Sequence, residues 1–316
     1  MPLKKRILII FFLFAVIDAF LIVLSPRSSG DAIQAAFDAE FFSRPDGYPG
    51  LIKHYGFKFR IPPLQMDPGL MYRALASGTV DVIDGFATDG RIPAYNLVTL
   101  YDDQGFFPPY HAAPLIREET LNAFPEIEDI LGLIAERIDD STMQRLNLQA
   151  DEKGRKAYNI AKEFLTENGW LGTAVHPRVS EERIIVGGKH FTEQEIVGEL
   201  IAILLETHLN IPVDRKLNMG GTMICFNALR SGDIDLYVEY TGTGLINILK
   251  RNVISNPNEV YTIVKDAFKR EFQLVWLRPL GFNNTYTLTM KEEFTDELGI
   301  TTISDLARII REERSR

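Results

Sequence analysis

The chain has 316 residues, of which 46% are hydrophobic and 24% are charged, and its formal net charge is −9. This composition excludes a disordered chain and leaves room for one large or two medium-sized cores. No basic stripe is present, which argues against nucleic acid as a partner. Cys225 is the only cysteine and the histidines are scattered, so neither a disulfide nor a metal site is expected.

Residues 1–30 differ in kind from the rest of the chain. Basic residues at 4–6 precede an apolar run over 7–24 that only Asp18 interrupts. In length the run lies between the core of a signal peptide and a membrane-spanning helix, and is nearer the span. Because Pro26 disfavours cleavage after Ser25, an uncleaved anchor is favoured over a cleaved signal. The basic residues predict that the chain after residue 30 lies outside the cytoplasm.

Residues 36–170 predict alternating elements, with strands at 37–41, 57–61, 80–83 and 97–100 and helices at 49–55 and 68–77. Arg44 follows the first of these strands beside two phenylalanines, which favours a position at a cleft. Phe86 follows the third strand. The prolines at 108 and 109 exclude a helix and hold Tyr110 on a stiff, extended segment. Helical spacing over 117–169 predicts helices that serve as core and cover, without chemistry of their own.

A linker is expected over 171–182, and a second unit follows, with strands at 184–188, 213–217, 235–238 and 274–277 and helices at 193–208, from 222, at 259–272 and at 303–312. Thr192 is the expected N-cap of the first helix. The turn at Gly187 and Gly188 matches neither a dinucleotide fingerprint nor a P-loop, so no nucleotide cofactor is expected. Asn284 and Tyr286 fall at a strand boundary.

One stretch occurs twice. Residues 74–90 read ALASGTVDVIDGFATDG and residues 228–244 read ALRSGDIDLYVEYTGTG, with Phe86 and Tyr240 at corresponding places. Either copy alone reads equally well as an ordinary turn between a strand and a helix. Together they predict two similar α/β lobes, each with an aromatic side chain at the carboxyl end of a strand, where open parallel sheets bind ligands.

The aromatics at strand or loop ends are Phe86, Tyr110, Tyr240 and Tyr286. Each alone is more often a core residue than a site residue. As a set they predict a box of π-faces, which suits a quaternary ammonium because that group carries charge but no N–H to donate. If Arg44 reaches the same cleft, its planar fork would match a carboxylate on the ligand.

The runs VGGKHFTEQ, NMGGT, IDLYVEYTGTG, FNNTYTLTM, FFSRPDGY, VDVIDGFATDG and DDQGFFPPYHAAP strongly resemble the glycine betaine/carnitine/choline-binding proteins of osmoprotectant ABC importers. The resemblance covers nearly all of residues 36–170 and 184–310. It implies an α/β fold of the two-lobed periplasmic-binding-protein type II, closing on a quaternary amine in an aromatic cage. The residues that it places at the ligand are Tyr240, Tyr286, Tyr110 and Phe86 as the cage, Arg44 as the carboxylate partner, and Lys189, Gln194, Thr243 and Asn284 as polar neighbours. Phe86 departs from the family, which usually has Tyr there.

The order of the two halves also departs from the family, in which the part resembling 184–310 comes first. The chain therefore looks circularly permuted: an anchor or signal at 1–30, the second part of the binding fold at 31–170, a linker at 171–183 and the first part at 184–316. The expected partners are a quaternary amine, an ABC permease with its ATPase subunit, and the membrane through the N-terminal helix. A membrane-tethered osmolyte sensor is the alternative. An enzyme is not expected, because no nucleophile elbow, paired-carboxylate motif or metal set is found.

Overall fold

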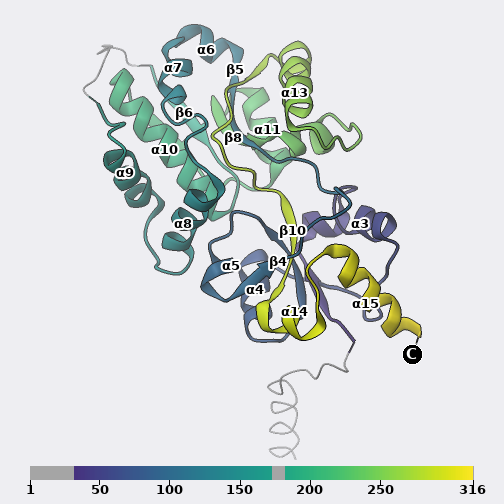
Figure 1. The fold of residues 1–316 in the computed structure, drawn as a ribbon. Helices are drawn as coiled ribbons and strands as arrows, with labels where there is room; N and C mark the ends of the chain where they lie inside the picture. Colours follow the sequence, from purple (N-terminus) through teal and green to yellow (C-terminus); the bar gives the residue numbers. More distant parts are fainter. Residues whose placement is uncertain (1–31, 173–181, 316) are drawn as a thin grey trace, which may run out of the picture.

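The computed structural model describes residues 32–172 and 182–315. These residues form two α/β lobes, one above the other in Figure 1, each built on its own sheet. The expected anchor at 7–24 and most of the expected linker lie outside the described residues. Within the described ranges, no helix has the length and hydropathy of a membrane span.

The first lobe, called here the β1 lobe, has a sheet in the order β2-β1-β3-β10-β4. Its strands are β1 (Ala35–Phe37), β2 (Leu64–Gln65), β3 (Val82–Phe86), β4 (Leu97–Thr99) and β10 (Tyr286–Lys291). Strand β10 is antiparallel to β3 and to β4, whereas β1 is parallel to β2 and β3. The helices of this lobe are α2 (Ala39–Ser43), α3 (Tyr48–Tyr55), α4 (Pro68–Ala76), α5 (Arg91–Ala94), α14 (Glu292–Leu298) and α15 (Ile303–Ser315).

The second lobe, called here the β6 lobe, has a sheet in the order β7-β6-β8-β5-β9. Its strands are β5 (Ala112–Arg117), β6 (Ile184–Gly187), β7 (Val213–Lys216), β8 (Leu236–Tyr240) and β9 (Leu274–Trp276). Strand β5 is antiparallel to both of its neighbours. The helices are α6 (Glu118–Ala123), α7 (Glu126–Gly132), α8 (Asp140–Asp151), α9 (Ala157–Glu167), α10 (Thr192–Leu209), α11 (Thr222–Ser231), α12 (Thr241–Thr243) and α13 (Pro257–Phe272), with a π-helical turn at Gly244–Ile248.

The two sheets have the same internal order, and the repeated stretch occupies the same place in each. In each copy a helix (α4 or α11) ends at a glycine turn and leads into a strand (β3 or β8). The turn glycines, Gly78 and Gly232, have φ of 74° and 81°, which L side chains rarely adopt. In each lobe one strand, β5 or β10, is antiparallel to its neighbours. The chain enters that strand from the other lobe, through residues 100–111 before β5 and through residues 277–285 before β10. Two crossings therefore join the lobes.

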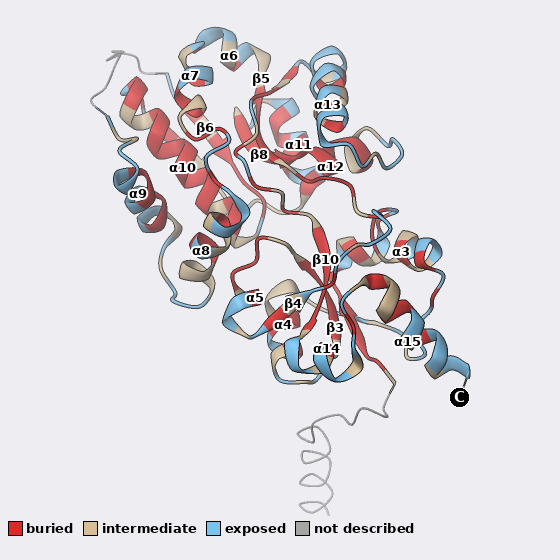
Figure 2. Ribbon diagram, in the orientation of Figure 1, coloured by how far each residue is buried: buried red, intermediate tan, exposed pale blue. Residues whose placement is uncertain are grey.

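The largest apolar core runs through both lobes and includes most of α10, which is buried along nearly its whole length (Figure 2). Helix α15 closes the β1 lobe: Leu306 shares this core with Phe37, and the backbone N–H of Ile33 donates to the carboxylate of Glu313 at 3.2 Å. The last helix and the first described strand are thus neighbours.

Several local predictions are wrong. The strand expected at 37–41 ends at Phe37, because the Asp38 carboxylate accepts the N–H groups of Glu40 and Phe41 at 2.6 and 3.2 Å and starts helix α2. Residues 57–61 form no strand, and the paired strand is β2 at Leu64–Gln65. Thr192 is the first residue of α10 and not its cap, since its hydroxyl donates to Asp151.

Candidate functional site

The four predicted aromatics come together where the lobes meet. Phe86 ends β3 and Tyr286 begins β10; they are register partners, with ring centroids 5.2 Å apart. Tyr110 stands edge-on to Tyr286 at 5.6 Å. Tyr240 ends β8 in the other lobe, and Phe191 lies 6.3 Å from both Tyr240 and Phe86. These five rings are called the aromatic cluster below.

Phe191 was not among the predicted cage residues. It stands directly before α10, where a phenylalanine reads as an ordinary apolar residue at a helix start. One feature of the sequence could have identified Phe191 as a site residue: it follows a glycine turn at the end of β6, the strand next to β8 in the sheet. Strand ends of neighbouring strands meet at the same edge of a sheet, so Phe191 and Tyr240 face the same space.

Glu193 is a buried carboxylate at the aromatic cluster, and sequence analysis missed it too. It is 3% exposed and follows Phe191 by two residues, in the first turn of α10. Its Oε1 accepts from the hydroxyl of Tyr240 at 2.7 Å and from Nδ2 of Asn284 at 2.9 Å. Its Oε2 accepts from the Thr88 hydroxyl and, at 3.1 Å, from Nδ2 of Asn147.

All four partners of Glu193 are neutral, and no ion pair to it occurs among the described residues. Burial raises its pKa above the ordinary glutamate value, and the hydrogen bonds from Thr88, Tyr240, Asn147 and Asn284 oppose that rise. Burial and the Glu193 charge also raise the pKa of the Tyr240 phenol. The cluster therefore contains a carboxylate whose charge is hydrogen-bonded but not neutralised by a cation.

Glu193 also joins the two lobes. Thr88 belongs to the β1 lobe, two residues after β3, whereas Asn147 comes from α8 of the β6 lobe. Asn147 donates to the carbonyl of Thr88 at 2.9 Å as well, and Gln144 donates to the carbonyl of Ala87 at 2.7 Å. Helix α8 was expected to be cover without chemistry, but it closes one side of the site.

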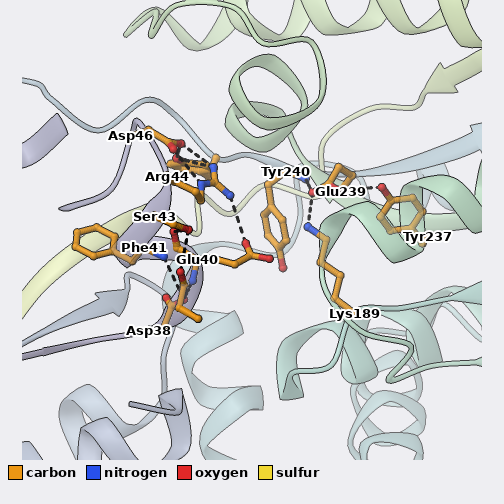
Figure 3. Close-up of polar contacts among 12 residues, drawn as sticks. Asp38, Glu40, Phe41, Ser43, Arg44, Asp46, Lys189, Tyr237, Glu239 and Tyr240 are labelled. Carbon is orange, nitrogen blue, oxygen red and sulfur yellow. Dashed lines mark hydrogen bonds and ion pairs between the residues drawn. The ribbon is translucent and has the colours of Figure 1, made fainter. Parts of the chain in front are cut away.

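Arg44 lies beside the cluster with most of its hydrogen-bonding fork occupied (Figure 3). Its Nε and Nη2 donate to the two carboxylate oxygens of buried Asp46 at 2.9 and 2.6 Å. The carbon at the centre of the guanidinium is 5.5 Å from the ring centroid of Tyr286 and 5.9 Å from that of Tyr110. The Tyr110 hydroxyl also donates to Asp46. Only Nη1 faces an exposed group, Glu40, at 3.5 Å.

Lys189 is paired in a similar way on the other side of Tyr240 (Figure 3). Its Nζ is 2.5 Å from Oε1 of Glu239, which is fully buried and also accepts the Tyr237 hydroxyl through Oε2. The same Nζ lies 5.0 Å from the ring centroid of Tyr240. Both cations predicted for the site are therefore balanced by a carboxylate of the chain itself.

The remaining predicted residues divide into two that touch the cluster and one that does not. Gln194 donates to the Tyr240 hydroxyl at 3.1 Å and to the carbonyl of Val238 at 2.9 Å, which fixes the Tyr240 ring. Asn284 binds Glu193, as described above. Thr243 is buried in α12, but no hydrogen bond joins its side chain to the cluster within 32–172 and 182–315.

Helix α12 approaches the cluster closely enough to require glycine. A Cβ on Gly242 would lie 2.8 Å from two ring carbons of Tyr110 and 2.9 Å from the carbonyl oxygen of Pro109. Neither neighbour is the free end of a flexible side chain. Gly242 therefore lets the β6 lobe pack against the ring of Tyr110.

The arrangement as a whole suits a cation that needs no hydrogen-bond acceptor. π-faces attract positive charge, and a buried carboxylate without a cationic partner adds to that attraction. In the described part of the chain, no group of histidine, cysteine and acidic side chains is arranged to hold a metal. Two lobes of like topology, joined by two crossings around such a cluster, define a ligand-binding protein of the two-lobed α/β class.

Sequence comparison places the chain within that class. It belongs to the family described as the substrate-binding domain of the ABC-type glycine betaine transport system, whose profile matches residues 25–167 and 182–313. That family is one of transport proteins and not a class of enzymes.

Individual relatives match about half of the chain. The carnitine transport binding protein OpuCC of Listeria monocytogenes is 39% identical over 147 residues, 46% of this chain and 47% of the relative. The glycine-betaine-binding protein of Pseudomonas aeruginosa is 40% identical over 43% of this chain and 44% of its own length. The ergothioneine transport permease/ergothioneine binding protein EgtU of Helicobacter pylori is 38% identical over 53% of this chain and 31% of its own length.

A solved structure titled glycine betaine/carnitine/choline ABC transporter is 38% identical, with a TM-score of 0.37 over 45% of this chain and 52% of that one. In the three relatives named above, the region aligned with this chain covers between about a third and a half of the relative's own length.

Proposed function

We propose that the chain captures a quaternary ammonium osmolyte of the glycine betaine, carnitine or choline type between its lobes and delivers it to an ABC importer. The observation that carries the proposal is the aromatic cluster around Glu193. Four of its rings, those of Phe86, Phe191, Tyr240 and Tyr286, are linked by centroid distances of 5.2 to 6.3 Å, and rings from both lobes take part.

The charge of the cluster supports a cationic ligand over a neutral one. The positive charges of Arg44 and Lys189 are matched by Asp46 and Glu239, which leaves the charge of Glu193 without a counter-ion. An uncompensated buried carboxylate is costly, and a trimethylammonium group held among the rings would supply the missing positive charge. The aromatic rings attract such a charge without offering it a hydrogen bond, which suits a group that has no N–H to donate.

The role proposed for each predicted residue follows from its place. Tyr240, Tyr286, Tyr110 and Phe86 would form the cage, with Phe191 as a further wall. Gln194, Lys189 and Asn284 would hold Tyr240 and Glu193 in position, and Thr243 would support α12. Arg44 would read a ligand carboxylate through Nη1, the part of its guanidinium that Asp46 does not occupy.

Transfer to a permease and its ATPase subunit on the extracytoplasmic side of the membrane is part of the same proposal. Membership of the family of ABC-type substrate-binding domains supports delivery over sensing. The apolar run at 7–24, preceded by basic residues, supports a position outside the cytoplasm and an anchor in the membrane.

We also propose that the binding fold is circularly permuted within one chain. Residues 32–99 and 286–315 build the β1 lobe while 112–172 and 182–276 build the β6 lobe, so the chain passes from lobe to lobe twice. The neighbouring positions of α15 and β1 support closure within one chain. The family profile matches both halves, whereas each relative quoted above aligns with only about half of the chain, as a changed order of segments would produce.

The test is calorimetric titration of the full chain with choline, carnitine and glycine betaine, and of the variants Tyr110→Ala, Tyr240→Ala and Tyr286→Ala. Loss of a desolvated cation–π contact worth ~2 kcal/mol weakens binding about thirtyfold. The control is Tyr158→Ala, a half-exposed tyrosine on α9, which should bind as the parent does. Unchanged affinity in all three cluster variants, with folding intact, would end the cage proposal.

A further inference from the structure

Two amide oxygens beside Glu193 receive no hydrogen bond from any residue that the structure describes. Asn284 and Asn147 each donate a side-chain N–H to the Glu193 carboxylate, at 2.9 and 3.1 Å. Their amide oxygens are fully buried and accept nothing from the described residues. Turning either amide over would set its oxygen against the carboxylate, so Glu193 fixes the orientation of both. The two oxygens remain open as acceptors.

Asn284 lies next to the aromatic cluster, whereas Asn147 lies at the contact between the lobes. Asn284 stands two residues before Tyr286, is 7% exposed, and donates its backbone N–H to the carbonyl of Tyr110 at 3.1 Å. Asn147 lies on α8 and its Nδ2 also reaches the carbonyl of Thr88. Of the two residues, Asn284 is therefore the one in contact with the residues of the rings, through the Tyr110 carbonyl and through the Glu193 oxygen that also accepts the Tyr240 hydroxyl.

A trimethylammonium group cannot satisfy this acceptor, because it has no N–H to donate. A buried carbonyl oxygen without a donor costs free energy, and native proteins leave few of them. A hydroxyl elsewhere on the ligand would supply the donor. A ligand carboxylate in the place of that hydroxyl would be unfavourable, because it would bring a second acceptor to the Asn284 oxygen and a second negative charge close to Glu193.

We propose that the site selects quaternary amines that also carry a hydroxyl or N–H donor, and that the Asn284 oxygen accepts this donor beside Glu193. The inference rests on the proposed function and narrows it. Choline and carnitine carry the required hydroxyl, and glycine betaine does not. Asn284 thereby becomes the residue that distinguishes members of the quaternary amine class.

The experiment compares choline with its methyl ether, which keeps the charged head and lacks the donor. Tetramethylammonium and glycine betaine complete the series, all titrated calorimetrically into the full chain. Choline is expected to bind at least about tenfold, or ~1.4 kcal/mol, more tightly than its methyl ether. The Asn284→Ala variant should bind choline and its methyl ether with equal affinity, because the acceptor that distinguishes the two ligands is gone. In the control Asn147→Ala both affinities should fall by the same factor, because that side chain acts at the contact between the lobes.

Equal affinity of the parent chain for choline and its methyl ether would overturn this inference, since water would then satisfy the Asn284 oxygen. Tighter binding of glycine betaine than of choline would overturn it as well. Both results leave the proposed function intact. If none of the quaternary amines binds, tetramethylammonium included, the proposed function itself fails and the inference with it. Because the ligand series is measured on the parent chain, a variant that fails to fold does not decide the outcome.

Discussion

Replacing Tyr240 by Phe separates the hydroxyl of this residue from its ring. The hydroxyl donates to Glu193 at 2.7 Å and accepts from Gln194 at 3.1 Å. Without it, Asn284 is the one donor to Oε1 of Glu193 that remains in the described part of the chain. A hydrogen bond to a charged group is worth ~1.5–3 kcal/mol, so we expect the free energy of unfolding of Tyr240→Phe to fall by about 2 kcal/mol near neutral pH.

The loss should depend on pH in a defined direction. Burial raises the pKa of Glu193, so the unfolded chain loses this proton at a lower pH than the folded chain does, and stability falls as pH rises through that window. Removing the Tyr240 hydroxyl takes away one of the bonds that oppose the rise. The deficit of Tyr240→Phe relative to the parent should therefore be larger at pH 8 than at pH 5.

Urea denaturation followed by circular dichroism at several pH values measures this difference. The matched control is Tyr237→Phe on the same strand, whose hydroxyl donates at 2.9 Å to Glu239, the carboxylate already paired with Lys189. The control is expected to lose stability without changing affinity for a quaternary amine. A Tyr240→Phe variant as stable as the parent, or with a deficit that does not grow with pH, would refute the role assigned to Glu193.

Three further predictions concern other parts of the site. Arg44→Ala should weaken binding of glycine betaine by ~1.5–3 kcal/mol more than binding of choline; equal losses in calorimetry would show that Arg44 acts through packing alone. Gly242→Ala should weaken binding at least about tenfold by displacing Tyr110, whereas Gly172→Ala, whose Cβ would be 3.7 Å from its nearest neighbour, should bind normally. Burial raises the pKa of Asp84 well above its ordinary value, so stability should fall as pH rises from the pKa of the unfolded chain towards that of the folded chain, and Asp84→Asn should remove this fall in denaturation measurements.

The repeated stretch was the most informative feature of the sequence. It predicted a helix, a glycine turn and a strand in each copy, and the turns at Gly78 and Gly232 have the backbone conformation that makes glycine necessary. Because the strand ends at Phe86 and Tyr240 follow from the same pattern, two of the clustered aromatics were identified without knowledge of the fold.

Strand β5 was missed for a physical reason. Pro114 lies in the middle of a strand that pairs on both sides, and proline usually marks an edge or a break. Here its carbonyl still accepts from the N–H of Leu277 at 2.9 Å. In the opposite case, Phe57 and Phe59 alternate as a strand would, but they are buried against neighbouring aromatics without forming a ladder.

Glu193 was missed because its environment is made by residues distant in the sequence. An acidic residue in the first turn of a helix is favoured by the helix dipole and needs no other explanation. Its burial depends on Thr88, Asn147 and Asn284, which come from three other segments of the chain. No local sequence pattern predicts such a contact, whereas the pattern of the strand does predict the position of Tyr240.

The most direct test of the central claim compares choline with its neutral analogue, in which a tert-butyl group replaces the trimethylammonium group. The two molecules have the same shape and the same hydroxyl and differ in charge. If the aromatic cluster and Glu193 recognise a cation, calorimetry will show choline binding at least about thirtyfold more tightly, from a cation–π contribution of ~2 kcal/mol. Equal affinity for the two would contradict the account, because it would show that the rings bind a shape and not a charge.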